Sequence, residues 1–257
     1  MSEIIFLGTG PSTGVPVIAC SCKTCKSKSR YNKRLRPSIL IRHNKKNILV
    51  DAGPDIRQQA LKYKIKKVDA LIITHSHFDH IAGIDDLRIY NRKKKKAIDC
   101  FLLKETYEEL KVKYEHLFTR NLDGHTKSAK FVFHILDDQK DHFKFAGITF
   151  NYFSFFQDSK KVLGIRLNNI AYVTDIKRYD KKKLDEINNL DFLILSCLKK
   201  TFCDVHFNLK EAIDFIKKIN PKMSFLTHLA HEVDYHSFLP KNLKNIKLAY
   251  DGLILRF

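Results

Sequence analysis

The stretch THSHFDH, residues 74–80, decides how this sequence is interpreted. It follows a mostly apolar run, VDALII, that predicts a buried strand. His75 and His77 stand two positions apart, so one extended or tightly turned segment can direct both imidazoles to one point. Asp79 and His80 then require the chain to turn back toward that point. Such crowding of nitrogen and oxygen ligands predicts a site for a small divalent cation rather than a polar loop.

Two further candidate ligands come directly after predicted strands. Asp175 follows the run AYVT, and His228 follows the run SFLT. Ligands at strand ends rest on a stiff part of the scaffold, which holds metal geometry well. Each residue alone would be an ordinary turn residue, but together with residues 74–80 they extend the predicted metal site.

The motifs resemble those of the PhnP group of the metallo-β-lactamase fold, which is related more distantly to the tRNA 3′-processing endonucleases. The resemblance implies a four-layer αββα sandwich of two mixed β-sheets flanked by helices, whereas periodicity alone supports only a mixed α/β domain. It also implies phosphodiester hydrolysis, in the type case of the five-membered cyclic phosphate of a phosphorylated ribose. The motifs are Leu7-Gly-Thr-Gly with Gly14-Val-Pro, Asp51-x-x-Pro-Asp55, Gly83-Ile-Asp-Asp-Leu-Arg88, Gly164-Ile-Arg166, Tyr172-Val-Thr-Asp175, Thr227-His228-x-x-His231 and Ala249-Tyr-Asp-Gly252.

This resemblance implies a site for two divalent ions, Zn²⁺ or Mn²⁺, that share a hydroxide able to attack phosphorus. The first ion would be held by His75 and His77, the second by Asp79, His80 and His228, and Asp175 would bridge the two ions. Asp79 would thereby also be a catalytic residue.

Two more residues are assigned to the site by the same resemblance. Asp51 would orient a ligand His through a hydrogen bond. His206 would protonate the departing alkoxide, although a His in a loop before a helix is the alternative interpretation.

The chain departs from the family pattern at one ligand. Gln157 stands where the first ion's remaining ligand, a His, is expected. An amide oxygen suits harder ions better than zinc. Three outcomes are open: the first ion binds loosely and is Mn²⁺ rather than Zn²⁺, Asp158 substitutes as the ligand, or catalysis is weakened or lost.

A second group of metal ligands is predicted near the N-terminus. Cys20, Cys22 and Cys25 form a C-x-C-x-x-C cluster, which in a cytosolic chain suggests a metal rather than a disulfide. The resemblance adds His231 and implies a closed structural zinc site. Three reduced thiols in a basic loop are the alternative.

Composition and charge bear on the partners. The net charge of +19 fits either a small phosphorylated substrate or RNA, or simply a solvated Lys-rich surface. No run of about 18 apolar residues and no signal peptide is found, so we expect a cytoplasmic protein without membrane contact. A homodimer is an expectation from the resemblance.

We therefore expect one metallo-β-lactamase-like domain over residues 1–257, with a Cys-rich zinc-binding loop at about 20–25. The expected function is a metal-dependent phosphodiesterase that acts on a small, cyclic or open phosphodiester. The alternatives are a ribonuclease related to the tRNA 3′-processing enzymes and a weakened metal-binding homologue. Local patterns also predict a helix capped by Asn208 and Glu211, and a C-terminal hairpin that turns at Asp251-Gly252.

Overall fold

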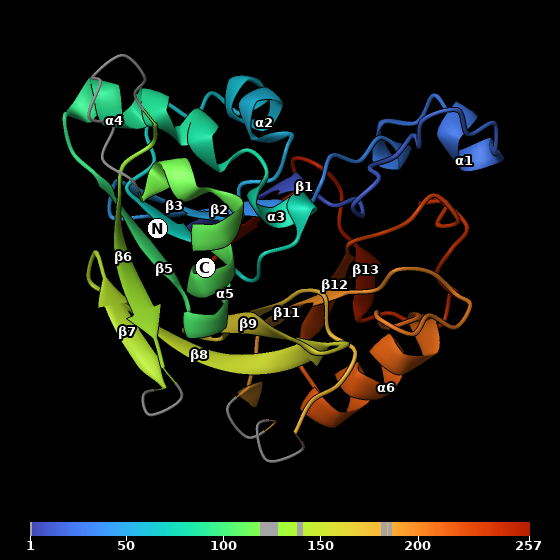
Figure 1. The fold of residues 1–257 in the computed structure, drawn as a ribbon. Coiled ribbons are helices and arrows are strands. Elements are labelled where there is room, and N and C mark those ends of the chain that lie inside the picture. The colour runs from blue at the N-terminus through green and yellow to red at the C-terminus, as the bar shows by residue number, and fades with distance from the viewer. Residues whose placement is uncertain (1, 119–127, 138–140, 181–183, 185–186) are drawn as a thin grey trace.

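A computed structural model describes residues 2–118, 128–137, 141–180, 184 and 187–257 (Figure 1). In this part of the chain, two mixed seven-stranded sheets face each other and helices cover their outer faces. The expected αββα sandwich is therefore confirmed.

The first sheet contains the N-terminal half of the chain and one C-terminal strand. Its order is β14-β1-β2-β3-β4-β5-β6. The β2–β3 hairpin is antiparallel and the strands from β3 to β6 run parallel. Its strands are β1 (Glu3–Gly8), β2 (Ser38–His43), β3 (Lys46–Val50), β4 (Ala70–Ile72), β5 (Ile98–Leu103), β6 (Phe131–Leu136) and β14 (Ile254–Arg256).

The second sheet has the order β13-β12-β11-β10-β9-β8-β7. Its strands β10 to β13 run parallel, so their carboxyl ends meet at one edge. Its strands are β7 (His142–Phe145), β8 (Ile148–Gln157), β9 (Lys160–Leu167), β10 (Ile170–Val173), β11 (Phe192–Ser196), β12 (Met223–Thr227) and β13 (Ile246–Leu248).

Helices flank both sheets (Figure 1). The predicted capping box is present in α6, where Asn208 accepts from the Glu211 N–H and the Glu211 carboxylate accepts from the Asn208 N–H. The helices are α1 (Lys23–Lys26), α2 (Ile56–Lys62), α3 (Phe78–Ile81), α4 (Arg88–Lys94), α5 (Lys104–Lys113) and α6 (Leu209–Ile219), with 3-10 turns η1 (Arg30–Asn32), η2 (Ile84–Leu87) and η3 (Glu115–Leu117).

The main core lies between the sheets. It contains fully buried side chains from both, such as Ile41 and Ile48 of the first sheet and Ile165 and Tyr172 of the second. Two further apolar clusters pack the helices onto the outer faces, one including Phe215 of α6. Burial of this apolar area is the main stabilising contribution to the sandwich.

The expected C-terminal hairpin is wrong. β13 pairs in parallel with β12 of the second sheet, while β14 pairs antiparallel with β1 of the first. Residues 249–253 pass from one sheet to the other, and the Gly252 N–H donates to the Phe6 carbonyl at 2.7 Å. The Asp251-Gly252 dipeptide does turn the chain, with Gly252 at a φ of 99°, but the turn directs the two strands into different sheets.

No described helix has both the length and the apolar character that a membrane span requires. The segment that carries the Cys cluster extends to one side of the sheets, beside the loop after β12 (Figure 1).

Candidate metal centre

The candidate ligands meet where strands of both sheets end. The His cluster follows β4, whereas Asp175 and His228 follow β10 and β12. The Leu163 N–H donates to the Thr74 carbonyl at 2.8 Å and joins the two sheets beside this point. The structure therefore brings together side chains that lie up to 153 positions apart in the sequence.

Four of these side chains enclose one small pocket. His80 Nε2 lies 3.4 Å from Asp79 Oδ2 and 3.2 Å from Asp175 Oδ2. His228 Nε2 lies 3.5 Å from Asp79 Oδ2 and 3.2 Å from Asp175 Oδ1. All four residues are buried. We refer to this group as the second pocket, and its donors are those expected for the second ion.

The second pocket fits a tetrahedral cation. Ligand atoms about 2.0–2.1 Å from a tetrahedral zinc stand roughly 3.3 Å apart, which matches the four distances above, and the donor atoms of Asp79, His80 and His228 lie within 4.8 Å of one another. His80 Nε2 and both ring nitrogens of His228 are buried without a hydrogen-bond partner among the described residues. Because a buried polar atom without a partner is costly, these nitrogens favour a bound cation.

Asp51 contacts the ring nitrogen of His80 that faces away from the second pocket, as expected. Its Oδ2 lies 2.7 Å from His80 Nδ1, which leaves Nε2 directed into the second pocket. The Asp51 carboxylate also accepts from the Thr74 N–H and from Thr74 Oγ1, both at 2.8 Å. Thr74 is a supporting residue that the sequence reasoning missed, although its place directly before the His cluster was a usable signal.

The other candidate donors form a looser group, which we refer to as the first pocket. His75 Nε2 lies 3.0 Å from His77 Nδ1, and His75 also shares a cluster of donor atoms with His80 and Asp175. His77 is partly exposed. The Gln157 amide nitrogen lies 3.5 Å from Asp175 Oδ1, and its buried carbonyl oxygen has no partner among the described residues. The first pocket therefore has fewer strong donors than the second.

His206 lies beside both pockets. Its Nδ1 is 3.3 Å from Asp175 Oδ1, and its Nε2 is 3.0 Å from the Gln157 amide nitrogen. Its ring is stacked at 4.8 Å on the ring of His228. The imidazole expected to protonate the leaving group is thus next to the candidate donors and in contact with the atypical Gln157.

The electrostatics of the second pocket favour positive charge. Burial alone would lower the pKa of His80, but the carboxylates of Asp51, Asp79 and Asp175 raise it well above its usual value. His75 differs, because burial lowers its pKa well below the usual range. The three buried carboxylates around His80 thus favour the binding of a cation.

The Cys cluster forms a separate group. The Nδ1 atom of His231 lies 3.2, 3.6 and 3.7 Å from the sulfurs of Cys20, Cys22 and Cys25, respectively. Sulfur and nitrogen ligands of a tetrahedral zinc stand roughly 3.6 Å apart. The Cys25 N–H donates to the Cys22 sulfur and is the main cause that lowers the pKa of Cys22 to about 6, whereas burial raises the pKa of Cys25 to about 11. The four donors fit a closed zinc site.

A buried arginine links the two groups of donors, and the sequence reasoning missed it. Arg34 donates to the carbonyl oxygens of Ala230 and Val233 at 3.0 and 2.7 Å. These bonds hold the loop that carries both His228 and His231. Its position in a basic segment gave no signal, because burial depends on the packing of that segment against the loop after β12.

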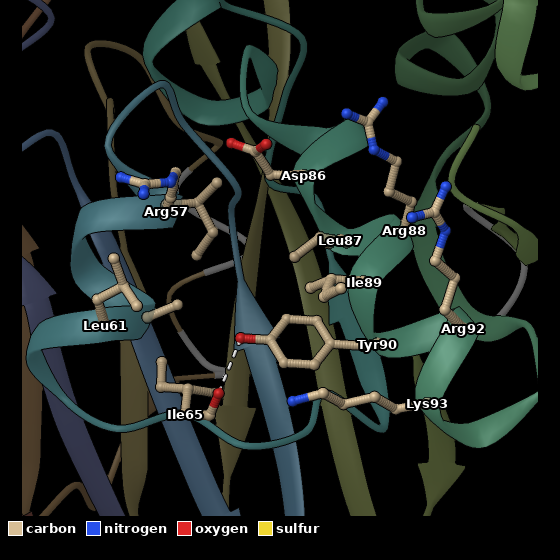
Figure 2. A pocket seen from close by; sticks show the side chains of 12 residues that line it. Arg57, Leu61, Ile65, Asp86, Leu87, Arg88, Ile89, Tyr90, Arg92 and Lys93 are labelled. Carbon is tan, nitrogen blue, oxygen red and sulfur yellow. Dashed lines mark hydrogen bonds between the residues drawn. The ribbon is translucent and has the colours of Figure 1, made fainter. Parts of the chain in front are cut away.

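A larger pocket of about 440 Å³ lies between α2 and the η2–α4 segment (Figure 2). Figure 2 shows an apolar floor of Ile65, Leu87 and Tyr90, where the Tyr90 hydroxyl donates to the Ile65 carbonyl at 2.9 Å. None of the predicted site residues lines this pocket. The candidate metal centre is therefore distinct from it.

Comparison with known proteins identifies the family. The family model described as the beta-lactamase superfamily domain matches residues 46–229, which include the His cluster, Asp175 and His228. The chain belongs to this superfamily. Together with the αββα sandwich, this membership gives the chain the metallo-β-lactamase fold.

Solved structures of the superfamily resemble the chain over its whole length. A crystal structure described as a new diphosphatase from the PhnP family is 29% identical, with a TM-score of 0.91, and the match covers 100% of this chain and 97% of that one. Zn²⁺-bound PqqB from Methylobacterium extorquens has a TM-score of 0.78 at 18% identity, over 99% and 100% of the two chains. The latter similarity concerns the fold alone.

Curated relatives match in part. An octanoyltransferase of Porphyromonas gingivalis is 31% identical over 255 residues, which are 97% of this chain and 50% of that protein. The chain thus spans about half the length of this relative. A ribonuclease Z of Bradyrhizobium sp. is 34% identical over 89 residues, 34% of this chain and 24% of that protein.

Proposed function

We propose that the chain is a metal-dependent phosphodiesterase that acts on a small phosphorylated substrate. The observation that carries this proposal is the second pocket, where buried imidazole nitrogens without a hydrogen-bond partner among the described residues face two carboxylates at distances that suit a tetrahedral ion. The similarity to a PhnP-family diphosphatase supports phosphorus as the reacting centre. The name of the octanoyltransferase describes a protein twice as long as the matched part, so it assigns no acyl transfer to this chain.

The metal ligands and His206 would have different roles in hydrolysis. Divalent ions held here would activate water near neutral pH and neutralise charge on the phosphoryl oxygens. Asp175 directs one oxygen toward His80 and the other toward His228, and it would hold these donors in fixed positions relative to each other. His206, which lies 3.3 Å from Asp175, would be the candidate for protonating a departing oxygen.

The test is hydrolysis of bis(p-nitrophenyl) phosphate by purified protein whose metal content is measured by elemental analysis. We expect Asp79→Ala and His228→Ala to abolish turnover while the protein stays folded. His134→Ala is the matched control, since the partly exposed His134 of β6 pairs with Asp99 of β5 and not with a candidate donor. Wild-type turnover in both site variants would refute the proposal.

A second candidate function, a ribonuclease, is favoured by the charge around α4. Arg57, Arg88, Arg92 and Lys93 surround the apolar floor of the pocket in Figure 2. A neighbouring pocket of about 420 Å³ also borders on α4 and contains Lys95, Lys96 and Lys130. Such a cationic surface suits the phosphates of RNA.

Salt dependence distinguishes this candidate. Charge reversal at Arg88, Arg92 and Lys95 should weaken binding of single-stranded RNA and flatten the slope of log K against log salt by about 0.7 per lost phosphate contact. Reversal at Lys241, Lys244 and Lys247, which are equally exposed, is the control. An equal loss of RNA affinity in both triple variants would indicate non-specific electrostatic attraction and count against a ribonuclease.

A further inference from the structure

The chain exposes phenylalanine in an unusual place. All nineteen Phe side chains lie in the described part of the chain, and only three of them are exposed. These are Phe78 at 64%, Phe156 at 36% and Phe202 at 67%. Because exposed aromatic surface is unfavourable in water, exposed rings in segments that also carry candidate donors suggest a binding role.

All three lie in segments that supply the metal centre. Phe78 stands between His77 and Asp79, and Phe156 directly precedes Gln157. Adjacent Cα atoms are about 3.8 Å apart, so the backbone of both residues lies next to that of candidate donors, although the Phe156 ring points to the face of β8 opposite to Gln157. Phe202 lies in the loop that leads to His206, in which Val205 is also exposed.

Lys177 connects the segments that carry Phe156 and Phe202. The Lys177 N–H donates to the Phe156 carbonyl at 2.9 Å, and Lys177 Nζ lies 4.5 Å from the centre of the Phe202 ring. The contact between Gln157 and His206 joins the same two segments beside the donors. Lys177 is itself held by Glu211 at 2.6 Å, which fixes the ammonium over the ring.

Phe156 also lines a cavity that opens beside the first pocket. This cavity of about 300 Å³ is bordered by His75, Ser76, Ser159 and Lys160. Lys160 is bound to the Glu109 carboxylate at 2.6 and 2.7 Å, so the cavity is closer to neutral than its lysines suggest. A substituent of the substrate that is flat and largely uncharged would suit it better than a second phosphate.

We propose that Phe78, Phe156 and Phe202 form an aromatic rim that stacks on a planar aromatic group, of the nucleobase class, carried by the phosphodiester. The inference rests on the proposed function and names the substrate class of that site. Aromatic side chains stack on every base, because each base has a π-face. The rim would thus select nucleotide diesters over diesters with small aliphatic groups.

The test compares two substrates with the same leaving group. The p-nitrophenyl ester of thymidine 5′-phosphate and ethyl p-nitrophenyl phosphate both release p-nitrophenolate, so they differ only in the other substituent. We expect Phe78→Ala, Phe156→Ala and Phe202→Ala to lower kcat/KM on the nucleoside ester by about 5- to 150-fold, mainly through KM. On the ethyl ester the change should be small, and Phe202→Tyr should restore selectivity.

Val112→Ala is the control, because Val112 is an exposed apolar residue of α5 that is 84% accessible. Equal turnover of the two esters by the wild type, with no selective loss in the rim variants, would overturn the rim while leaving the phosphodiesterase intact. If neither ester is hydrolysed, the proposed function fails. Calorimetry then tests the aromatic rim by comparing the binding of adenosine 5′-phosphate and ribose 5-phosphate. The rim requires that adenosine 5′-phosphate binds more tightly and that Phe202→Ala loses this preference.

Discussion

At the scale of the residue, three side chains in the site stand on backbone that L-residues rarely adopt. Asp51, Asp175 and His228 have φ values of 64°, 53° and 59°. Such left-handed conformations are unfavourable for non-glycine residues and persist where the surroundings hold them. Here the carboxylate of Asp51 is bound by Thr74 and His80, and Thr174 Oγ1 donates to Asp175 at 2.6 Å. The site thus uses unfavourable backbone to direct its donors inward.

Gln157 gives the first residue-scale prediction. Gln157→His should tighten metal binding in the first pocket, because imidazole is a better ligand than an amide for transition ions. Loss of a hydrogen-bond partner behind a ligand already changes metal affinity about 10- to 100-fold, so we expect a gain of at least about tenfold. Competition with a chelator, read by elemental analysis, measures the affinity. Gln157→Leu should bring no gain, and an unchanged affinity in Gln157→His would show that residue 157 is not a ligand position.

At the scale of the element, close backbone packing sets the position of α3. Gly53, in the loop after β3, leaves no room for a side chain, since a Cβ atom there would stand 2.0 Å from the Asp79 carbonyl oxygen. The Ala52 N–H donates to the His80 carbonyl at 2.7 Å, and the Gly83 N–H donates to the Ala52 carbonyl at 2.8 Å. The loop after β3 therefore holds α3, and with it two candidate ligands, against the first sheet.

Gly53→Ala should displace Asp79 and lower metal affinity as well as stability. Overpacking of this kind typically costs about 1–3 kcal/mol. Gly164→Ala is the matched control, because its Cβ would meet the Phe153 ring at 2.1 Å within the second sheet instead of a ligand segment. Thermal unfolding and metal titration should show destabilisation in both variants and a loss of metal affinity in Gly53→Ala alone. Unaltered metal affinity in Gly53→Ala would contradict this role of the glycine.

The Cys-rich segment supports a second prediction at this scale. Cys22→Ser should remove about one zinc per chain and lower the unfolding temperature, because a structural ion stabilises the fold that binds it. The loop between His228 and His231 would lose its anchor at one end, while Arg34 would still hold it. Metal analysis and calorimetry check this outcome. Cys203→Ser, which removes a cysteine outside the cluster, should change neither value, and an unchanged metal content in Cys22→Ser would exclude the zinc site.

At the scale of the whole molecule, the candidate centre joins the two sheets. Asp79 and His80 come from the first sheet, whereas Asp175 and His228 come from the second, and they meet at 3.2–3.5 Å. A cation bound among them would link both halves of the sandwich. Its binding energy would then contribute to the stability of the entire chain.

Removing metal and adding it back should therefore change the temperature at which the whole chain unfolds. An ion present at a hundred times its Kd stabilises the fold by about 2.7 kcal/mol, or about 5–11 °C for a chain of this size. We expect the unfolding temperature of protein stripped of metal by a chelator to rise by this amount on addition of Zn²⁺ or Mn²⁺. Asp79→Ala in the Cys22→Ser background should show little gain, whereas a full gain there would mean that the stabilising ion binds elsewhere.

The sequence by itself determined the types of ligand and their places at strand ends, the helix cap at Asn208 and a mixed α/β domain. These features depend on neighbours a few positions apart, and spacing records such local geometry directly. Only the tertiary structure decided that β13 and β14 join different sheets, that Gln157 contacts His206, that Arg34 is buried and that Phe78, Phe156 and Phe202 remain exposed. Those outcomes depend on how two sheets, formed by distant parts of the chain, pack against each other, and no local spacing records that packing.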